Sequence, residues 1–421
     1  MFSSKFTNLS KITSPIILLY AKILQSFLSC TPFAAIRIAI LKRFACLSDA
    51  FYTQCLTWDR KIWLPNVTQL RQLKAFHLLT ILLLVDNHIL SYILGNEVLG
   101  YHKDSQLTFA ATVLLVISVF ITNCALIVSQ IYAFQGKTVC FIYRNVEILK
   151  KRCQTESEKP IQHINPIGIF LNICVTSVPL FPVVCVIAPI LEVITGNPAF
   201  DPSYFLTRNL TFIPLIGVIV VRMMINFFGA LHLSTVLFGM VIILVNIVIS
   251  VTGCLGWLSI DHNVLECLTV IKNYAGLRKG LAVYRQLEIF IREANHTLYY
   301  LLPIVGLTFF VSAVLLSYLV IKLHTTVPLL ITILSGAVVI FIGAVLHLTL
   351  PLVSAILARS ENLLRLWTLG ATSRSGFWTK QVRSCSRLRL YVGPFFHIEN
   401  NTRTVLIGSI FYYTASLLIS T

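Results

Sequence analysis

The sequence predicts an all-α membrane protein with seven transmembrane helices. Three observations lead to this fold class: apolar residues make up 57% of the 421 positions, charged residues make up only 12%, and the apolar residues gather in long runs. Soluble domains carry about 25% charged residues, so lipid is the expected solvent. None of the runs alternates as barrel strands do, and only helices or closed barrels satisfy their backbone hydrogen bonds in lipid.

Seven runs are long enough to cross the hydrocarbon core of a bilayer, which takes roughly 20 residues of helix. The predicted spans are 75–95, 107–134, 166–195, 224–256, 298–321, 327–357 and 404–421. The run 212–221 is too short to cross alone, and Arg222 separates it from the fourth span, so we expect an outer extension of that span.

The first 74 residues are predicted to form a cytoplasmic amino-terminal region, followed by a seven-helix domain at 75–421. Residues 14–41 are apolar, but Lys22 and Arg37 interrupt them. This pattern favours an interfacial helix over an eighth span.

Basic residues predict the orientation of the chain in the plasma membrane. If the amino terminus is cytoplasmic, the segments 1–74, 135–165, 257–297 and 358–403 face the cytoplasm and hold 29 of the 33 Lys and Arg residues. Because Lys and Arg concentrate in cytoplasmic loops, this distribution places the amino terminus inside and the carboxyl terminus outside. Asn209, in the sequon Asn209-Leu210-Thr211 of an outer loop, is the predicted glycosylation site.

Other functional classes are less well supported by the sequence. The net charge of +17 follows the membrane pattern, so no nucleic acid partner is expected. The sequence has no Cys-x-x-Cys pair, Cys/His cluster or common catalytic motif, so we expect no metal, no cofactor and no enzymatic activity. A secondary transporter would favour repeated halves and broken helices, and a G-protein-coupled receptor would have the opposite orientation; both are kept as alternatives.

The order of these segments resembles the arthropod gustatory and odorant receptor superfamily from about residue 65 to the end. The shared features are seven spans with an inner amino terminus, long inner loops, the short outer loop KLHTTV at 322–327, and the basic segment TKQVRSCSRLRLYVGPFFHIENN at 379–401 before the last span. The superfamily motif of Thr-Tyr, five apolar residues and Gln-Phe is reduced here to the Tyr of FYYTASLLIST. This departure is typical of a divergent, gustatory-like member.

The resemblance implies a chemosensory receptor subunit that forms a ligand-gated, non-selective cation channel for small taste or odour molecules. It implies a homo- or hetero-tetramer in which the seventh spans line a central pore. It also implies an anchor between subunits, built by the inner parts of spans four to seven. The ligand is expected in the outer half of each subunit, among spans two to six.

The last span carries a polar stripe when it is drawn as a helix at 100° per residue. The stripe consists of Ser409, Tyr413, Ser416 and Ser420, and the opposite face carries Ile407, Phe411 and Leu418. Such a stripe indicates either hydrogen bonding at a helix contact or a wetted pore wall, and the resemblance favours the pore. Because gates in the family are often apolar, Leu417 and Leu418 are the candidate gate.

The inner segment 280–300, GLAVYRQLEIFIREANHTLYY, has apolar residues at helical spacing. Tyr284, Leu287, Phe290 and Ile291 are the candidate residues of the subunit anchor. The alternative is an amphipathic helix on the membrane surface. We expect this helix to continue into span five, and Glu288 to pair with Arg292 one turn later.

Polar and aromatic residues in the outer halves of the spans are the candidates for a ligand pocket. Asp86 lies inside span one, where an ionisable group is costly and is therefore a functional candidate. The other candidates are Glu192, Asn226, Phe227, Phe228, His232 and Tyr318, because aromatic groups with a few polar groups suit a small ligand. For each residue taken singly, ordinary packing or lipid contact is the alternative. Membrane lipid and a small-molecule ligand are thus the expected partners.

Overall fold

The apolar runs of the sequence form seven long helices in the computed structural model, which describes residues 37–100, 107–153, 166–195, 201–208, 214–260, 274–372 and 376–420. The seven helices are α3 (Lys74–Val98), α4 (Phe109–Cys153), α5 (Pro166–Thr195), α7 (Leu215–Ile260), α10 (Leu301–Lys322), α11 (Leu329–Thr372) and α13 (Thr402–Ser420). Each of them is long and apolar enough to cross a membrane. The predicted fold class, all-α with seven spanning helices, is confirmed.

Shorter elements connect these helices. They are α2 (Arg37–Phe51), β1 (Leu56–Trp58), β2 (Pro65–Val67), η2 (Leu70–Gln72), α6 (Pro202–Thr207), α9 (Tyr274–Leu298), α12 (Gly376–Arg383), β3 (Tyr391–Val392) and β4 (Phe396–His397). The strands form two antiparallel ribbons, β1–β2 and β3–β4. In these ribbons Leu56 lies opposite Val67, and Tyr391 lies opposite His397.

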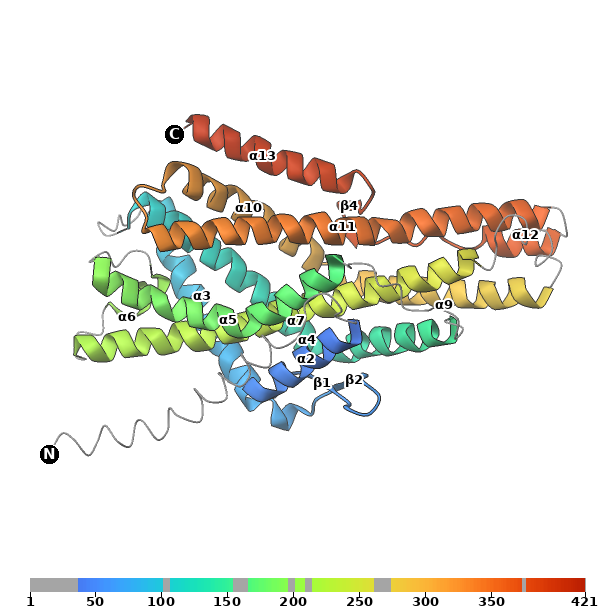
Figure 1. Ribbon diagram of the computed structural model, residues 1–421, viewed down its shortest axis with the longest axis horizontal. Helices are drawn as coiled ribbons and strands as arrows, with labels where there is room; N and C mark the ends of the chain where they lie inside the picture. Colours follow the sequence, from blue (N-terminus) through green and yellow to red (C-terminus); the bar gives the residue numbers. More distant parts are fainter. Residues whose placement is uncertain are drawn as a thin grey trace.

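Three helices extend well beyond the predicted spans. Helices α4, α7 and α11 have 45, 46 and 44 residues. At 1.5 Å per residue each is roughly 65–70 Å long, about twice the hydrocarbon thickness of a bilayer. Figure 1 shows their extended ends beside α9 and α12, at one end of the molecule. Residues 215–221 and Arg222 belong to α7, which confirms that part of the predicted extension of the fourth span.

The expected continuity between the inner amphipathic helix and span five is wrong. Helix α9 ends at Leu298, Tyr299 and Tyr300 form a turn, and α10 begins at Leu301. Pro303 supplies a physical reason, because it has no N–H to donate to the carbonyl of Tyr299 and so breaks the helical ladder here.

The two largest hydrophobic cores of the described residues hold most of the helices together. The larger core joins α2 and β1 to α3, α4, α5 and α7, and contains Phe44, Trp58 and Phe76. The second core lies among α9, α12 and the extended ends of α4, α7 and α11, and contains Tyr284 and Trp367. Helices α4, α7 and α11 contribute different stretches to each core, so they join the two cores into one continuous scaffold.

The segment 37–73 packs on the helical bundle. Arg43 donates a hydrogen bond of 3.0 Å to the Asn172 side chain of α5. The ring of Phe44 reaches α7 at Gly239, where a Cβ would come within 2.7 Å of it. Of the predicted interfacial helix 14–41, residues 37–41 belong to α2, and the rest lies outside the described residues.

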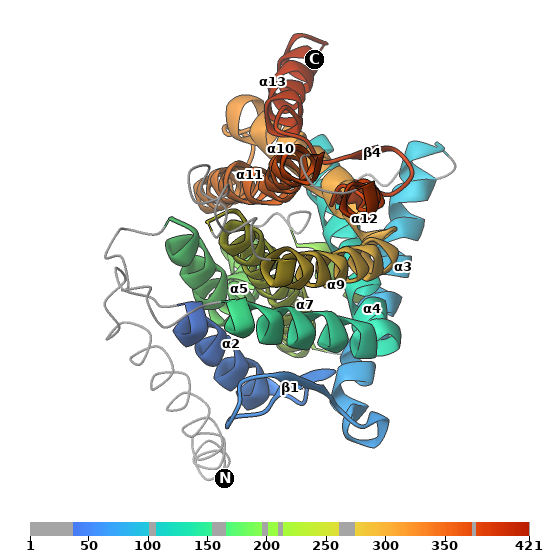
Figure 2. The ribbon, with the colours of Figure 1, turned by 90° about the vertical axis from the view of Figure 1, so that its right-hand side faces the viewer.

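Helix α13 lies at one edge of the molecule, where it packs on α10 and α11 (Figures 1 and 2). Only 6% of the residues in its most apolar stretch are buried, compared with 61% for the corresponding stretch of α7. Most of its surface is therefore left for lipid, water or another subunit.

Candidate ligand site and pore helix

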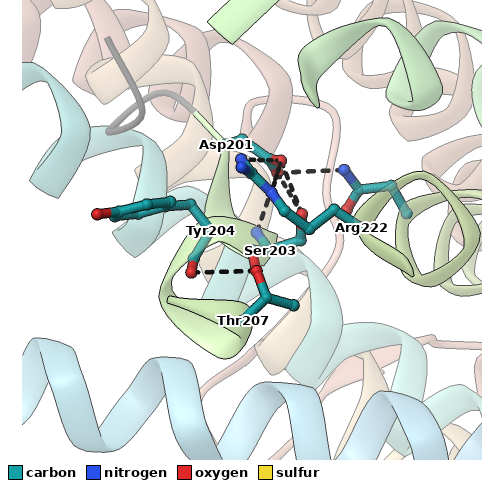
Figure 3. A network of polar contacts seen from close by, with 6 residues as sticks. Asp201, Ser203, Tyr204, Thr207 and Arg222 are labelled. Carbon is teal, nitrogen blue, oxygen red and sulfur yellow. Dashed lines mark hydrogen bonds and ion pairs between the residues drawn. The ribbon is translucent and has the colours of Figure 1, made fainter. Parts of the chain in front are cut away.

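A buried polar cluster forms where α6 meets α7 (Figure 3). Asp201 has an extended backbone and caps α6: its Oδ1 accepts a hydrogen bond of 3.0 Å from the backbone N–H of Ser203. Pro202 occupies the first turn, where its missing N–H costs nothing. The hydroxyl of Ser203 donates to the same carboxylate at 2.7 Å. The sequence Asp-Pro-Ser thus both starts the helix and orients the carboxylate.

Helix α7 supplies the counter-charge. Arg222 donates from Nε and Nη2 to Oδ2 of Asp201 at 3.1 and 2.7 Å, and Asn226, one turn later, donates to Oδ1 at 3.1 Å. The side chains of Arg222 and Asp201 are 4% and 0% exposed. The ring of Tyr204 lies 5.3 Å from the guanidinium carbon. Five donors on one carboxylate compensate for the cost of burying the charges.

Asp86 of α3 adds a second carboxylate to this neighbourhood. It is half-buried and lies within electrostatic range of Asp201. The next residue, Asn87, accepts a hydrogen bond from Thr122 at 2.7 Å and donates one to Asn123 at 3.0 Å, which fixes this part of α3 on α4. Two of the predicted pocket residues thus lie near the Asp201 carboxylate: Asn226 donates a hydrogen bond to it, and Asp86 is within its electrostatic range.

The structure places His232 elsewhere. Its ring is fully buried, with the hydroxyl of Tyr52 2.7 Å from Nδ1 and that of Thr80 3.0 Å from Nε2. The ring of Phe76 packs against it at 5.0 Å between centroids. His232 thus joins the amino-terminal segment to α3 and α7, away from the cluster around Asp201.

The aromatic candidates are also dispersed. Phe227 and Phe228 pack edge to face at 5.4 Å, and Phe228 is 37% exposed on the outside of the chain. Tyr318 of α10 is buried against Phe109 of α4, with ring centroids 6.0 Å apart. Glu192 belongs to α5, but its side chain lies outside the described residues, as does Asn209. The six predicted residues whose side chains the structure describes therefore do not gather around one common pocket.

Sequence reasoning missed Asp201, although a signal was present. Asp-Pro-Ser is a helix-start pattern with a capping residue followed by a proline at the first helical position. Arg222 was treated as the opening of a span, yet it lies inside α7. An arginine inside a spanning helix needs a buried acidic partner, and Asp201 is the acidic residue nearest to it in the sequence.

One face of α13 packs on the bundle. Leu406 and Ile410 pack against Ala313 of α10 and Ile342 of α11, and Thr414 of the same face is buried. These positions are four residues apart, so they form one stripe of the helix. The rest of α13 is half-buried or exposed.

The predicted pore stripe runs along the border of that packed face. Tyr413 is 53% exposed and contacts Phe310 of α10 edge to face at 5.6 Å. Ser416 and Ser420 are exposed, and Ser409 is half-buried. Ser420 donates to the carbonyl of Leu417 at 3.1 Å. Three of the four stripe residues, Tyr413, Ser416 and Ser420, are thus exposed on the surface of the single chain.

The face opposite the stripe, with Ile407, Phe411 and Leu418, was expected to meet lipid or packed helices. Ile407 and Leu418 are half-buried. Phe411 is 71% exposed, so none of the described helices covers that side of α13. The candidate gate residue Leu417 lies on another side of the helix and is half-buried.

The predicted anchor residues pack inside their own chain. Tyr284 and Leu287 are 0% exposed, and Phe290 and Ile291 are also buried. The hydroxyl of Tyr284 donates to the carbonyl of Ser386 at 2.8 Å. A contact between subunits through α9 would have to use its other face, where Ile289 is 54% exposed.

The expected Glu288–Arg292 pair is replaced by a contact in the other direction. Glu288 accepts a hydrogen bond from Arg285 at 2.9 Å and another from the hydroxyl of Ser386. Ser386 belongs to the basic segment before α13, and this segment lies close enough to α9 for Ser386 to donate to the Glu288 carboxylate. Burial raises the pKa of Glu288, but the hydrogen bonds from Ser386 and Arg285 outweigh it and hold the pKa below its ordinary value.

No group of three His, Cys, Asp or Glu residues in the described ranges is arranged to hold a metal ion. The described cysteines are free thiols.

No protein-family model matches the chain, and no curated protein matches it in sequence. Solved structures do match. The insect olfactory receptor OR5 from Machilis hrabei in complex with eugenol superimposes with a TM-score of 0.64 at 11% sequence identity, over 90% of this chain and 98% of that one. The chain has the fold of an insect olfactory receptor. A second structure of OR5 gives a TM-score of 0.61 with the same identity and coverage.

The olfactory receptor fold confirms the predicted resemblance at the level of architecture. The chain is a multi-pass membrane protein with this fold. At 11% identity the match carries no residue roles.

Proposed function

We propose that the protein is a chemosensory receptor subunit that forms a ligand-gated, non-selective cation channel in the plasma membrane. The observation that carries this proposal is the olfactory receptor fold, matched over 90% of the chain. The subunits assemble as a homo- or hetero-tetramer with the amino terminus in the cytoplasm. The reduced Thr-Tyr motif in α13 supports a divergent, gustatory-like receptor.

The exposure of α13 supports a pore at this helix. Its serines and Tyr413 lie on a spanning helix that packs on α10 and α11 by one face only. Hydroxyl groups on such a helix need water or polar partners. In a ring of four subunits, Ser409, Tyr413, Ser416 and Ser420 face a central water column. The alternative is an apolar gate, with Leu417 or Leu418 forming the narrow point instead of the stripe.

The ligand is a small organic molecule that binds in the outer half of the helical bundle. OR5 was solved with eugenol, which is a small aromatic molecule. The cluster around Asp201 and Arg222 gives this half of the chain a rigid, charged wall beside Asp86. Asn226, Phe227, Phe228 and Tyr318 remain the proposed pocket residues, together with Glu192, although they are not gathered at one place in the isolated subunit.

Recording from excised patches with a panel of small organic ligands tests the proposal. A channel gives step-like unitary currents that need no cytosolic component. Saturable transport without unitary events would contradict the proposal and favour the secondary transporter. Responses that vanish on excision and return with guanine nucleotide and cytosol would favour a G-protein-coupled receptor.

A further inference from the structure

A hollow lies at the junction of η2 and α3, apart from the cluster around Asp201 and from α13. It is lined by Leu70, Arg71, Lys74, His77, Leu78 and Ile81. Lys74 is the first residue of α3 and the first of the spanning segment, so the hollow lies where the bilayer begins. Two of its six lining residues are permanent cations, one is an imidazole, and three are aliphatic.

Four of the six lining residues follow one line along α3, and Leu70 and Arg71 come from η2 before it. Lys74, His77, Leu78 and Ile81 are spaced by three or four residues and therefore share a face of α3. Leu78 is 68% and Ile81 57% exposed, and Leu70 of η2 is 71% exposed. The polar end of this face comes first and the apolar end follows as the helix enters the membrane. A phospholipid has the same order, with a charged head group followed by an acyl chain.

The cations in the hollow are unpaired. Within the described part of the chain, Arg71 and Lys74 make no ion pair or side-chain hydrogen bond, and the first turn of α3 carries no acidic residue. Two arginines elsewhere in the chain, by contrast, have acidic partners: Arg387 lies 2.9 Å from Glu361, and Arg222 is paired with Asp201. Two unpaired positive charges beside exposed aliphatic groups complement an anionic lipid.

We propose that this hollow binds an anionic phospholipid, with its phosphate-containing head group between Arg71 and Lys74 and one acyl chain along Leu78 and Ile81. The site goes beyond the proposed function, because it requires only that α3 enters a membrane at Lys74. A zwitterionic lipid offers the same acyl chain without the net negative charge, so it binds more weakly. The bound lipid would fix the depth at which α3 enters the bilayer.

Photo-crosslinking to defined lipids tests this site. The purified full-length protein is placed in nanodiscs that contain phosphatidylserine or phosphatidylcholine, each with the same photoreactive acyl chain. We expect phosphatidylserine to label the peptide that contains Leu78 and Ile81 several-fold more than phosphatidylcholine does. Each Lys or Arg near an anionic surface contributes about 1 kcal/mol, so Arg71→Gln with Lys74→Gln removes a preference of at most about thirty-fold.

Two controls make the outcome decisive. The first control, Lys380→Gln with Arg383→Gln, removes two exposed positive charges from α12, which does not line the hollow. We expect this variant to keep the preference for phosphatidylserine. Labelling by phosphatidylcholine reports folded protein in every variant. Equal labelling by both lipids in the wild type, or an unchanged preference in the Arg71/Lys74 variant, would overturn the proposal. Loss of the phosphatidylserine label on adding millimolar inorganic phosphate would show that a free anion occupies the site instead.

Discussion

A carboxylate and a guanidinium that are both removed from water must satisfy each other, and the Asp201–Arg222 pair does so with two hydrogen bonds. Asn226 and Ser203 fill the remaining acceptor positions of the carboxylate. The pair joins α6, which is only 6 residues long, to α7 near the start of that helix. It therefore holds α6 against the helical bundle.

Breaking this pair is expected to be costly. Arg222→Leu leaves the Asp201 carboxylate buried without its counter-charge, which destabilises a protein by about 3–5 kcal/mol. Asp201→Asn combined with Arg222→Leu restores neutrality and keeps a capping side chain, so the double variant loses less than the sum of its single changes. Chemical unfolding in detergent micelles measures the free energy of unfolding of the single variants and of the double variant.

The exposed pair Arg387–Glu361 provides the matched control. Its side chains are 58% and 40% exposed, so Arg387→Gln changes the free energy of unfolding by at most about 1 kcal/mol. If Arg222→Leu cost no more than Arg387→Gln, the pair at Asp201 would not be the buried link described here.

For single residues, the sequence indicates which side chains are functional candidates better than it indicates which of them lie close together in the fold. Asp86 and Asn226 were chosen as polar residues inside predicted spans, and both lie near the Asp201 carboxylate, which the sequence did not single out. His232 was misplaced because it follows Asn226 by six residues, and nothing in a single helix reveals that Tyr52 and Thr80 approach its ring from other elements. Long-range partners of this kind are set by packing and not by spacing.

Among the elements, α9 shows how one carboxylate joins two distant segments. Glu288 receives hydrogen bonds from Arg285 of its own helix and from Ser386, which lies 98 residues later. The segment that contains Ser386 leads through the β3–β4 ribbon into α13. This contact fixes the start of the proposed pore helix relative to the second core.

The contact is expected to depend on pH. Because the pKa of Glu288 is lower in the folded chain than its ordinary value of 4.5, its contribution to stability is fully present above that value. As the pH falls from there through the lower, folded pKa, the contribution is lost. The difference in thermal midpoint between the wild type and Glu288→Gln is therefore constant at neutral pH and shrinks below about pH 4.5.

Variants of the two arginines identify the partner. Arg285→Gln removes a donor that holds the pKa of Glu288 down, so it weakens the acid-dependent difference. Arg292→Gln leaves that difference unchanged. If Arg292→Gln weakened the acid-dependent difference and Arg285→Gln left it unchanged, the contact with Arg285 would be contradicted and the originally expected Glu288–Arg292 pair supported.

Helix positions were predictable because a bilayer imposes long apolar runs: each predicted span overlaps one of the seven long helices, and the spans 75–95, 166–195 and 224–256 lie entirely within one. The ends of the longest helices were not predictable to the same degree. Residues 135–153 of α4 contain Arg144, Lys150 and Lys151, so the apolar signal ends while the helix continues. Burial against α9 in the second core sustains the helix there, and that partner is not visible in the local sequence.

For the whole molecule, the proposed orientation rests on the basic residues, of which 29 of 33 lie on the predicted inner side. Expression in glycosylating cells with Asn209→Gln tests it: we expect a glycosidase-sensitive mobility shift in the wild type and none in the variant. Asn66 stands in another sequon, Asn66-Val67-Thr68, on the predicted inner side. A shift that persists in Asn209→Gln and disappears in Asn66→Gln would place η2 and the start of α3 outside, and so reverse the orientation.

The central claim is that α13 lines a water-filled pore, and accessibility of introduced cysteines to a charged thiol reagent tests it most directly. Applied from the outer side during ligand-evoked current, the reagent should alter the current of Ser416→Cys and Ser420→Cys, with Ser420→Cys the faster. Thr414→Cys, buried against the bundle, and Phe411→Cys, exposed in the subunit but on the opposite face, should react little. The unsubstituted chain, with its 11 native cysteines, sets the background. Reaction at Phe411→Cys equal to that at Ser416→Cys, or no reaction at any stripe position while ligand still evokes current, would contradict the account and place the pore elsewhere.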